Sequence, residues 1–142
     1  MIALSEHLCF KTYAVSRYIT GLYKPYLDEV FLTYPQYLVM LVLWENGEMN
    51  IGKIGGHLHL DNGTLTPLLK RMEKNGLLKR TRSLDDERVV LVSLTEQGEY
   101  LKEKVKHIPE AVQARFQLDE QKKKQLMSGL DQILSIQLPS NL

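Results

Sequence analysis

The chain contains a single cysteine, Cys9, whose surroundings suit thiol chemistry. On a helix, Cys9 and Tyr13 are one turn apart, so their side chains are neighbours. A thiolate is the nucleophilic form of cysteine, and a phenol that donates a hydrogen bond stabilises it. The same spacing also fits an inert cysteine buried on a helix face. One cysteine allows neither an internal disulfide nor a zinc site built from several thiolates.

A second group of polar side chains lies within residues 61–75. Apolar residues recur there at helical spacing, so the intervening polar residues face outward. Short amide and hydroxyl side chains come first, where they can reach base edges, and cations follow, where they can reach phosphates. Gly63 would let a phosphate approach the backbone at the start of the helix. The outward side chains are Asn62, Thr64, Thr66, Lys70, Arg71 and Lys74.

The positive charge of the chain is concentrated in its centre. The net charge is only +1, yet residues 50–82 hold seven Lys or Arg side chains and two acidic ones. A polyanion responds to this local field rather than to the net charge. An ordinary solvated helix face is the alternative explanation for a basic helix, and the tight turn and basic hairpin beside it favour nucleic acid.

Composition and length predict one soluble domain with one core. The 142 residues are 44% apolar and 25% charged, which is too little charge for a disordered chain. No apolar run is long enough to span a membrane and no secretory leader opens the chain, so we expect a cytoplasmic protein. His57 and His59 lie on different sides of a helix, so we expect no metal site and no cofactor.

Helical periodicity and capping residues predict four helices in the first half of the chain. They cover residues 4–22, 36–44 and 51–60, and a stretch that begins near residues 62–64 and ends at 75. The last two are joined by a tight polar turn, as in a helix-turn-helix. The residues expected to punctuate these helices are Pro25, Thr33, Pro35, Asn46, Gly47, Asn50, Asp61 and Gly76.

The second half of the chain predicts a hairpin followed by further helices. Residues 77–81 and 89–93 are β-prone runs around a charged tip, which indicates a wing with Arg88 placed to enter a minor groove. Thr95 opens a helix that Pro109 kinks or breaks. Asp119 then caps a last helix, whose apolar residues are Leu126, Met127, Leu130, Ile133, Leu134 and Leu138.

These elements predict a mainly α fold with a small β-hairpin wing, a winged helix-turn-helix. We expect a single domain over residues 1–142, with the winged lobe at about 36–94. The amphipathic ends, about 1–30 and 95–142, are expected to form a homodimer, because one subunit could hardly bury all their apolar stripes. A monomer with the ends folded onto its own core is the alternative.

The stretches DNGTLTPLLKRMEKNGL and DDERVVLVSLTEQG resemble the MarR family of winged-helix regulators. They are similar in particular to the branch that contains the organic hydroperoxide resistance regulators and their thiol-based relatives. This resemblance implies that the second helix of the motif lies in the major groove of a double-stranded, pseudo-palindromic operator and that the wing enters the minor groove. Asn62 stands where a serine is common. The matching positions are Gly63, Thr64, Thr66, Pro67, Lys70, Arg71, Asp86 and Arg88.

The same resemblance assigns a redox sensor. The segment LCFKTYAVSRY places Cys9 where the peroxide-sensing relatives carry their sensor cysteine. It implies that Tyr23 and Tyr34 donate hydrogen bonds to Cys9 of the partner subunit and that Tyr13 lies close by. An oxidised Cys9 would then react with a low-molecular-weight thiol, pair with the partner's Cys9, or oxidise further. We expect the mixed disulfide with the small thiol, because it is reversible.

Two other functions stay open. A MarR-type repressor could instead respond to a small phenolic or apolar ligand bound between the dimer helices and the DNA-binding lobe. A thiol peroxidase would need a cation and a hydroxyl beside Cys9, which the sequence does not provide, so we expect no enzyme.

Overall fold

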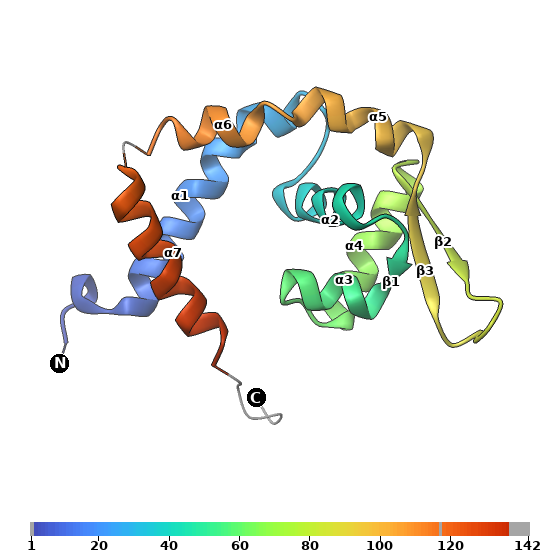
Figure 1. Ribbon diagram of the computed structural model, residues 1–142, viewed down its shortest axis with the longest axis horizontal. Helices are drawn as coiled ribbons and strands as arrows, with labels where there is room; N and C mark the ends of the chain where they lie inside the picture. Colours follow the sequence, from blue (N-terminus) through green and yellow to red (C-terminus); the bar gives the residue numbers. More distant parts are fainter. Residues whose placement is uncertain (1, 117, 137–142) are drawn as a thin grey trace. The chain divides into compact units, whose positions relative to one another are not determined.

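The structure is a computed structural model that describes residues 2–116 and 118–136. The chain falls into two units, the first ending at Ile108 and the second beginning at Pro109. The first unit contains a long helix, a helix-turn-helix and a small antiparallel sheet (Figure 1). The mainly α fold with a hairpin wing is therefore confirmed.

Helix α1 (Leu8–Asp28) follows a short 3-10 turn, η1 (Leu4–Glu6). The predicted interruption at Pro25 is wrong, because Pro25 lies inside α1 and the helix continues for another three residues. A proline removes one backbone hydrogen bond, and burial of Leu27, which is 1% exposed, anchors the turn that follows.

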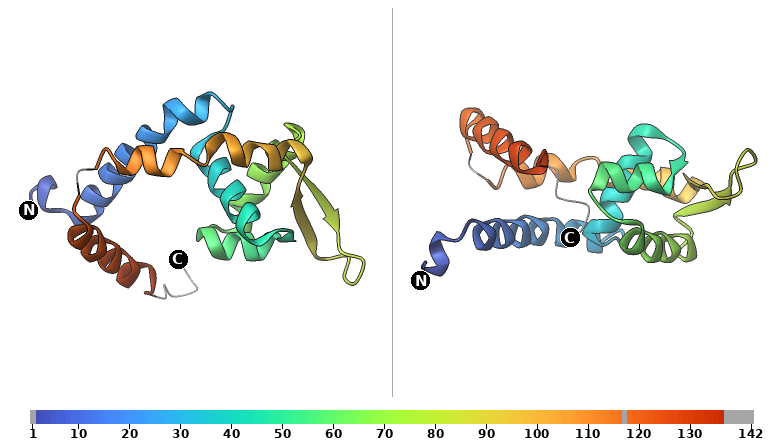
Figure 2. Two further views of the ribbon diagram at one scale, coloured as in Figure 1. Left: turned by 45° about the horizontal axis from the view of Figure 1, so that its top comes forward. Right: turned by 90° about the horizontal axis from the view of Figure 1, so that it is seen from below.

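The N-terminal half of α1 projects away from the lobe formed by the next three helices, as Figures 1 and 2 show. The predicted apolar stripe is present here but is not covered by the described chain: Leu4 is 62% exposed, Leu8 63% and Val15 50%. Ile19 and Leu22, nearer the lobe, are half-buried. A stripe of this kind needs another surface to cover it.

Helix α2 (Tyr34–Asn46) is the central buried helix that the apolar run predicted. Its start is a capping box: the Gln36 backbone N–H donates to Thr33 Oγ1 (3.4 Å), and the Thr33 N–H donates to Gln36 Oε1 (2.9 Å). Pro35 lies in the first turn, where its missing N–H costs nothing. Gly47, with φ of 73°, ends the helix as expected.

Helices α3 (Ile51–Leu58) and α4 (Asn62–Lys74) form the predicted helix-turn-helix. Asn50 caps α3 by accepting from the Lys53 N–H at 2.8 Å, and Asp61 caps α4. The turn between them is tight: a Cβ at Gly55 would lie 2.6 Å from the Leu60 carbonyl oxygen, so only glycine fits.

The sheet contains three strands in the order β1-β3-β2. Strands β2 (Leu78–Arg82) and β3 (Val90–Leu94) are the predicted hairpin, each displaced by one residue, and they form the wing that extends from the lobe in Figure 2. Strand β1 (Met49–Asn50) pairs with β3 and was not predicted, because two residues are too short to show a period.

Helix α5 (Glu96–Val105) is capped by Thr95, whose Oγ1 accepts from the Gly98 N–H at 3.1 Å. It is tied to α2 by Trp44 Nε1, which donates to the Gly98 carbonyl oxygen at 3.1 Å. Helix α6 (Ile108–Gln113) follows a two-residue turn. Pro109 therefore lies in the first turn of a new helix, which agrees with the predicted break.

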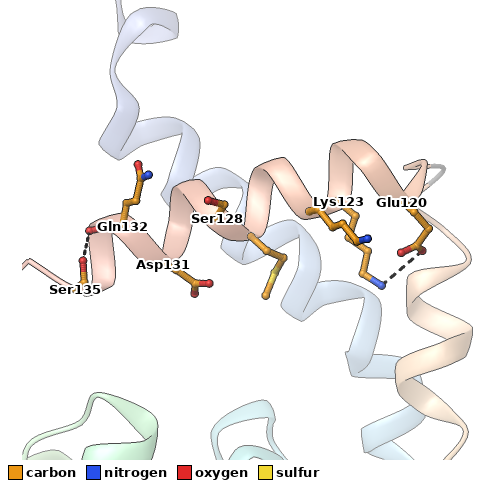
Figure 3. A pocket seen from close by; sticks show the side chains of 8 residues that line it. Glu120, Lys123, Ser128, Asp131, Gln132 and Ser135 are labelled. Carbon is orange, nitrogen blue, oxygen red and sulfur yellow. Dashed lines mark hydrogen bonds and ion pairs between the residues drawn. The ribbon is translucent and has the colours of Figure 1, made fainter.

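In the second unit, Asp119 caps helix α7 (Glu120–Leu134) by accepting from the Lys122 N–H at 2.7 Å, as predicted. The predicted apolar residues of α7 are all exposed, between 37% for Leu130 and 57% for Leu134, and Leu138 lies outside the described residues. Figure 3 shows another face of α7, a shallow hollow with Glu120, Lys123, Ser128, Asp131, Gln132 and Ser135. No described helix is long and apolar enough to cross a membrane.

Candidate functional site

The outward face of α4 is a straight ridge of four residues. Leu65, Leu68, Leu69 and Met72 point into the core, each 7% exposed or less. On the opposite side lie Gly63, Pro67, Lys70 and Lys74, all exposed and spaced by four, three and four positions. The cations lie towards the C-terminal end of this ridge, whereas its N-terminal end carries Gly63 and Pro67 rather than the expected amide and hydroxyl side chains.

The remaining predicted residues flank the ridge. Asn62 and Arg71 are exposed, whereas Thr66 is half-buried. Thr64 is exposed, but its Oγ1 donates to Asp61 Oδ2 at 2.8 Å. The Thr64 hydroxyl therefore already forms a hydrogen bond inside the protein. Thr66 lies one helical turn after Asn62, on the same flank of the ridge.

The carboxylate of Asp61 fixes the start of α4. Its Oδ1 accepts from the Thr64 backbone N–H at 2.8 Å, and this bond, followed by the bond from the Thr64 hydroxyl, lowers the pKa of Asp61. A Cβ at Gly63 would lie 2.9 Å from Asp61 Oδ1. Gly63 therefore gives the cap its room, in addition to the predicted close approach of a phosphate.

The tip of the wing is shaped by Asp86. Its backbone carbonyl accepts from the Val89 N–H, and its Oδ1 accepts from the Arg88 N–H, both at 2.9 Å. Arg88 itself is exposed. The sequence indicated Asp86 only through a resemblance, and the structure gives it a physical role, because Asp86 fixes the backbone from which Arg88 projects.

One basic residue of the wing is committed to an ion pair that sequence reasoning missed. Arg80 on β2 donates to Glu73 on α4 from its backbone N–H, its Nε and its Nη2, at 2.9, 3.0 and 2.8 Å. The bonds from the Arg80 side chain, and then from its backbone, lower the pKa of Glu73. Lys79 and Arg82 stay exposed. No local sequence pattern links residues 73 and 80, because they belong to different elements.

Cys9 is exposed, on the first turn of α1. Tyr13, one turn further, is 59% exposed, and its hydroxyl oxygen accepts from Arg17 Nη1 at 3.4 Å. The Arg17 guanidinium also lies 5.7 Å from the centre of the Tyr13 ring. Cys9, Tyr13 and Arg17 therefore follow one another on adjacent turns of α1.

The other two predicted sensor residues belong to an aromatic cluster between α1 and α2. The ring centres of Tyr23 and Tyr34 are 5.0 Å apart, and Tyr37 lies 5.8 Å from Tyr23 and 6.3 Å from Tyr34. Burial raises the pKa of Tyr23 and, with a smaller effect of Tyr23, that of Tyr34. Burial chiefly raises the pKa of Tyr37 to about 12. Tyr37 was not singled out from the sequence, although it follows Tyr34 by three positions on α2.

Within one chain, Cys9 is far from this cluster. Cys9 and Tyr23 are fourteen residues apart on one helix, which corresponds to about 21 Å along its axis. The structure therefore brings Cys9 near Tyr13 but not near Tyr23 or Tyr34 of the same chain. The described residues also contain no group of three or more His, Cys, Asp or Glu that could hold a metal ion.

Comparison with protein families gives a match to the family described as "Transcriptional regulator SarA/Rot" over residues 21–105. That range includes the Tyr23–Tyr34 pair, the helix-turn-helix, the wing and α5. It therefore contains the α4 ridge and Arg88, whereas Cys9 precedes it.

Three individual proteins are similar over nearly the whole chain. An organic hydroperoxide resistance transcriptional regulator of Bacillus subtilis is 50% identical over 131 residues, 92% of this chain and 89% of that protein. The HTH-type transcriptional regulator SarZ of Staphylococcus aureus is 39% identical over 132 residues, 93% of this chain and 89% of SarZ. The solved structure of reduced AbfR bound to DNA, a protein of Staphylococcus epidermidis, is 37% identical with a TM-score of 0.78, covering 92% of this chain and 91% of that one.

Proposed function

Because the chain belongs to the MarR-type family of winged helix-turn-helix transcription regulators, in the branch of the organic hydroperoxide resistance regulators, we propose that it is a redox-sensing repressor. It binds a pseudo-palindromic operator as a homodimer and releases it when an organic hydroperoxide oxidises Cys9. The observation that carries this proposal is that the same chain has an exposed thiol on α1 and a solvent-facing basic ridge on α4.

The α4 ridge supports the assignment of the DNA contacts. Lys70 and Lys74 contact phosphates together with Arg71, and the exposed N-terminal end of α4 approaches base edges through Asn62 and Thr66. Pro67 contacts the groove by its apolar ring, and Gly63 lets the backbone approach a phosphate. Thr64 contributes mainly by holding the cap, since its hydroxyl is bonded to Asp61. Arg88, oriented by Asp86, enters the minor groove.

The exposed apolar stripes at both ends support a homodimer. On α1 the stripe includes Leu8 and Val15, and on α7 it includes Leu130 and Ile133. Monomeric proteins rarely leave such faces in water. We therefore assign residues of about 1–30 and 95–142 to dimerisation and about 36–94 to the DNA-binding lobe, within one MarR-type domain.

The sensor is completed by the partner subunit. Since about 21 Å of helix separates Cys9 from Tyr23 in one chain, hydrogen bonds from Tyr23 and Tyr34 come from the other copy. A phenol is already protonated at neutral pH, and burial raises the pKa of Tyr23 and of Tyr34 further, so both can act as donors. Donors of this kind stabilise the thiolate that attacks a peroxide.

The oxidation proceeds in two balanced steps. The Cys9 thiolate attacks the terminal oxygen of the hydroperoxide, the S–O bond forms, the O–O bond breaks, and the alkoxide leaves as the alcohol after taking a proton. The thiol group of a low-molecular-weight thiol then attacks the sulfenic acid, which gives a mixed disulfide and water.

The dimer proposed above disfavours a disulfide between the two copies of Cys9. If Cys9 faces Tyr23 of the other copy, two-fold symmetry requires antiparallel α1 helices that cross midway, near Ser16. The two Cys9 residues are then about 21 Å apart along the helices, whereas a disulfide needs Cα atoms within about 7 Å. This supports the small thiol as the reaction partner. Bulk added at Cys9 would change the spacing of the two α4 helices and release the operator.

Operator binding by wild type and Cys9→Ser tests the proposal. Both proteins should bind the operator with similar affinity when reduced, and cumene hydroperoxide with a small thiol should release only wild type. Mass spectrometry of released wild type should show one thiol adduct per chain. Release of Cys9→Ser by the peroxide would refute the redox mechanism.

One observation favours the second candidate, control by a small ligand. A hollow of about 660 Å³ in the first unit has three aromatic side chains in its lining, Tyr26, Phe31 and Tyr100, beside polar and charged ones such as Gln97 and Lys104. If an aromatic compound released Cys9→Ser from the operator without any thiol adduct, this candidate would replace the first. The relatives reported above are transcription regulators, and the chain shares their fold rather than that of an enzyme.

A further inference from the structure

Thr95, the residue that caps α5, also contacts the two residues that follow α4 and end it. Its Oγ1 donates to the Gly76 carbonyl oxygen at 2.6 Å and accepts from the Gly98 backbone N–H at 3.1 Å. Its backbone N–H donates to the Leu77 carbonyl oxygen at 3.1 Å. One residue therefore joins the C-terminal end of α4 to the N-terminal end of α5.

Gly76 and Leu77 are themselves hydrogen-bonded back into α4. The Leu77 N–H donates to the Met72 carbonyl oxygen at 3.1 Å. The Gly76 N–H donates to the Glu73 carbonyl oxygen at 2.9 Å. With Gly76 at a φ of 73°, these two bonds form the Schellman motif that ends many helices. The N–H groups of these two residues therefore bind α4, and their carbonyl groups bind Thr95 at the start of α5.

Two further contacts close this junction. A Cβ at Gly98 would lie 2.1 Å from the Leu77 carbonyl oxygen, so α5 lies directly against the end of α4. From α2, Trp44 Nε1 donates to the Gly98 carbonyl oxygen at 3.1 Å. Gly98 is buried, and Thr95 and Trp44 are half-buried, so water competes little for these hydrogen bonds.

We propose that Thr95 is a positioning residue for DNA binding, which makes α4 follow α5. This inference rests on the proposed function, in which two copies of α4 enter major grooves of one operator. A dimer reads a fixed separation of half-sites only if each reading helix is held rigidly to the region that pairs the subunits. The region assigned above to dimerisation begins at Thr95, and this residue is bonded to the end of α4.

The competing explanation is that Thr95 serves α5 alone, as its cap, and that packing inside the lobe fixes α4. Three variants separate these two roles. Thr95→Ser retains both contacts of the hydroxyl. Thr95→Asp retains an oxygen that accepts from the Gly98 N–H, but its carboxylate has no proton to donate to the Gly76 carbonyl. Trp44→Phe removes the indole donor to Gly98 and retains an aromatic ring.

The test compares duplexes that differ only in the separation of their half-sites. The probe is a palindromic duplex that the reduced wild-type dimer selects from random-sequence DNA, with versions that carry one base pair more or fewer at the centre. One base pair moves a half-site by about 3.4 Å and rotates it by about 34°. Wild type and Thr95→Ser should bind the altered duplexes on the order of tenfold more weakly than the selected one. In Thr95→Asp and Trp44→Phe this ratio should fall to about threefold, because a loosened α4 adapts to either separation.

The ratio distinguishes positioning from a merely structural role. A loss of stability would weaken binding to all three duplexes alike and leave the ratio at its wild-type value. Unchanged ratios in Thr95→Asp and Trp44→Phe would overturn the proposal, and so would a reduced ratio in Thr95→Ser. If thermal melting shows that Thr95→Asp does not fold, Trp44→Phe decides the outcome.

Failure of this inference is distinguishable from failure of the proposed function. If the ratios do not change, wild type still selects a palindromic duplex and still releases it through Cys9 when peroxide is added. If wild type selected no palindromic duplex, the proposed operator binding by a dimer would be refuted, and this inference with it. Release of Cys9→Ser by peroxide would refute only the redox sensor.

Discussion

Glu73 on α4 and Arg80 on β2 form a clamp between the recognition helix and the wing. Three hydrogen bonds of 2.8–3.0 Å join them, and one of these comes from the backbone of Arg80. The side chains are partly covered, 35% and 23% exposed, so water weakens this pair less than a fully solvated one. The clamp fixes the angle between α4 and the hairpin that carries Arg88. Two parts of a protein that must enter two grooves at once need such a fixed angle.

Glu73→Gln tests whether the clamp serves DNA binding. Charge alone predicts tighter binding, because the variant removes a negative charge beside a polyanion. The clamp predicts the opposite, a loss on the order of tenfold, because a loosened wing would no longer hold Arg88 in the proposed minor-groove position.

The matched experiment is a cycle with Arg88→Ala, measured by operator titration. If the clamp acts through the wing, the double variant binds no more weakly than Arg88→Ala alone. Additive losses would mean that Glu73 supports α4 directly.

Two variants of Asp61 should distinguish the stabilising effect of its cap hydrogen bond from that of its charge. Asp61→Asn retains an oxygen that accepts from the Thr64 N–H, so its thermal stability should match wild type, whereas Asp61→Ala should melt a few degrees lower. The pKa of Asp61 is lowered in the folded protein, so its stabilising effect is present above the unfolded value and is lost as the pH falls through the folded one. Thermal melts between pH 7 and pH 2 should therefore show the gap between wild type and Asp61→Ala closing in acid. A gap that stays constant would contradict the capping assignment.

Substitution of Lys70 and substitution of Thr66 should change DNA binding in different ways. Lys70→Ala removes a proposed phosphate contact, so it should weaken binding to every sequence alike and lower the slope of log K against log salt by about one unit. Thr66→Ala should leave the salt slope unchanged and relax preference at one base pair by about 1–3 kcal/mol. Binding to operators substituted one position at a time checks both, with Lys11→Ala as a control outside α4. If Thr66→Ala weakened binding to all of these operators equally, Thr66 would not be a base-reading residue.

The tyrosine cluster should be visible in an alkaline titration. Burial raises the pKa of Tyr37 to about 12, so folded Tyr37 resists ionisation that the unfolded chain undergoes near its ordinary value of 10.0. The contribution of Tyr37 to the free energy of unfolding is therefore unchanged below pH 10, and it is lost as the pH rises towards 12. Phenolate absorbance should show a late phase that Tyr37→Phe removes, and Tyr23→Phe should reduce the shift of Tyr34. The absence of a late phase in wild type would show that the cluster is open to water.

Local sequence determined most of the helices and strands and which residues of α4 face outward. Each helix predicted from residues 4–75 is present, because apolar spacing and caps such as Asn50 and Asp61 act between residues close in the chain. The exposure of Lys70 and Lys74 on α4 could be predicted for the same reason. The ends were less predictable: Pro25 does not end α1, since burial of Leu27 offsets the lost hydrogen bond.

Tertiary structure decided which of these residues work together. The sequence presents Arg80 as one more cation of a basic wing, and only the packing of β2 against α4 commits it to Glu73. It also presents Cys9, Tyr23 and Tyr34 as one set, and only the continuity of α1 from Cys9 to Tyr23 shows that one chain holds them apart. Periodicity describes neighbours along a helix, whereas a pair across elements depends on how those elements pack, which no local pattern contains.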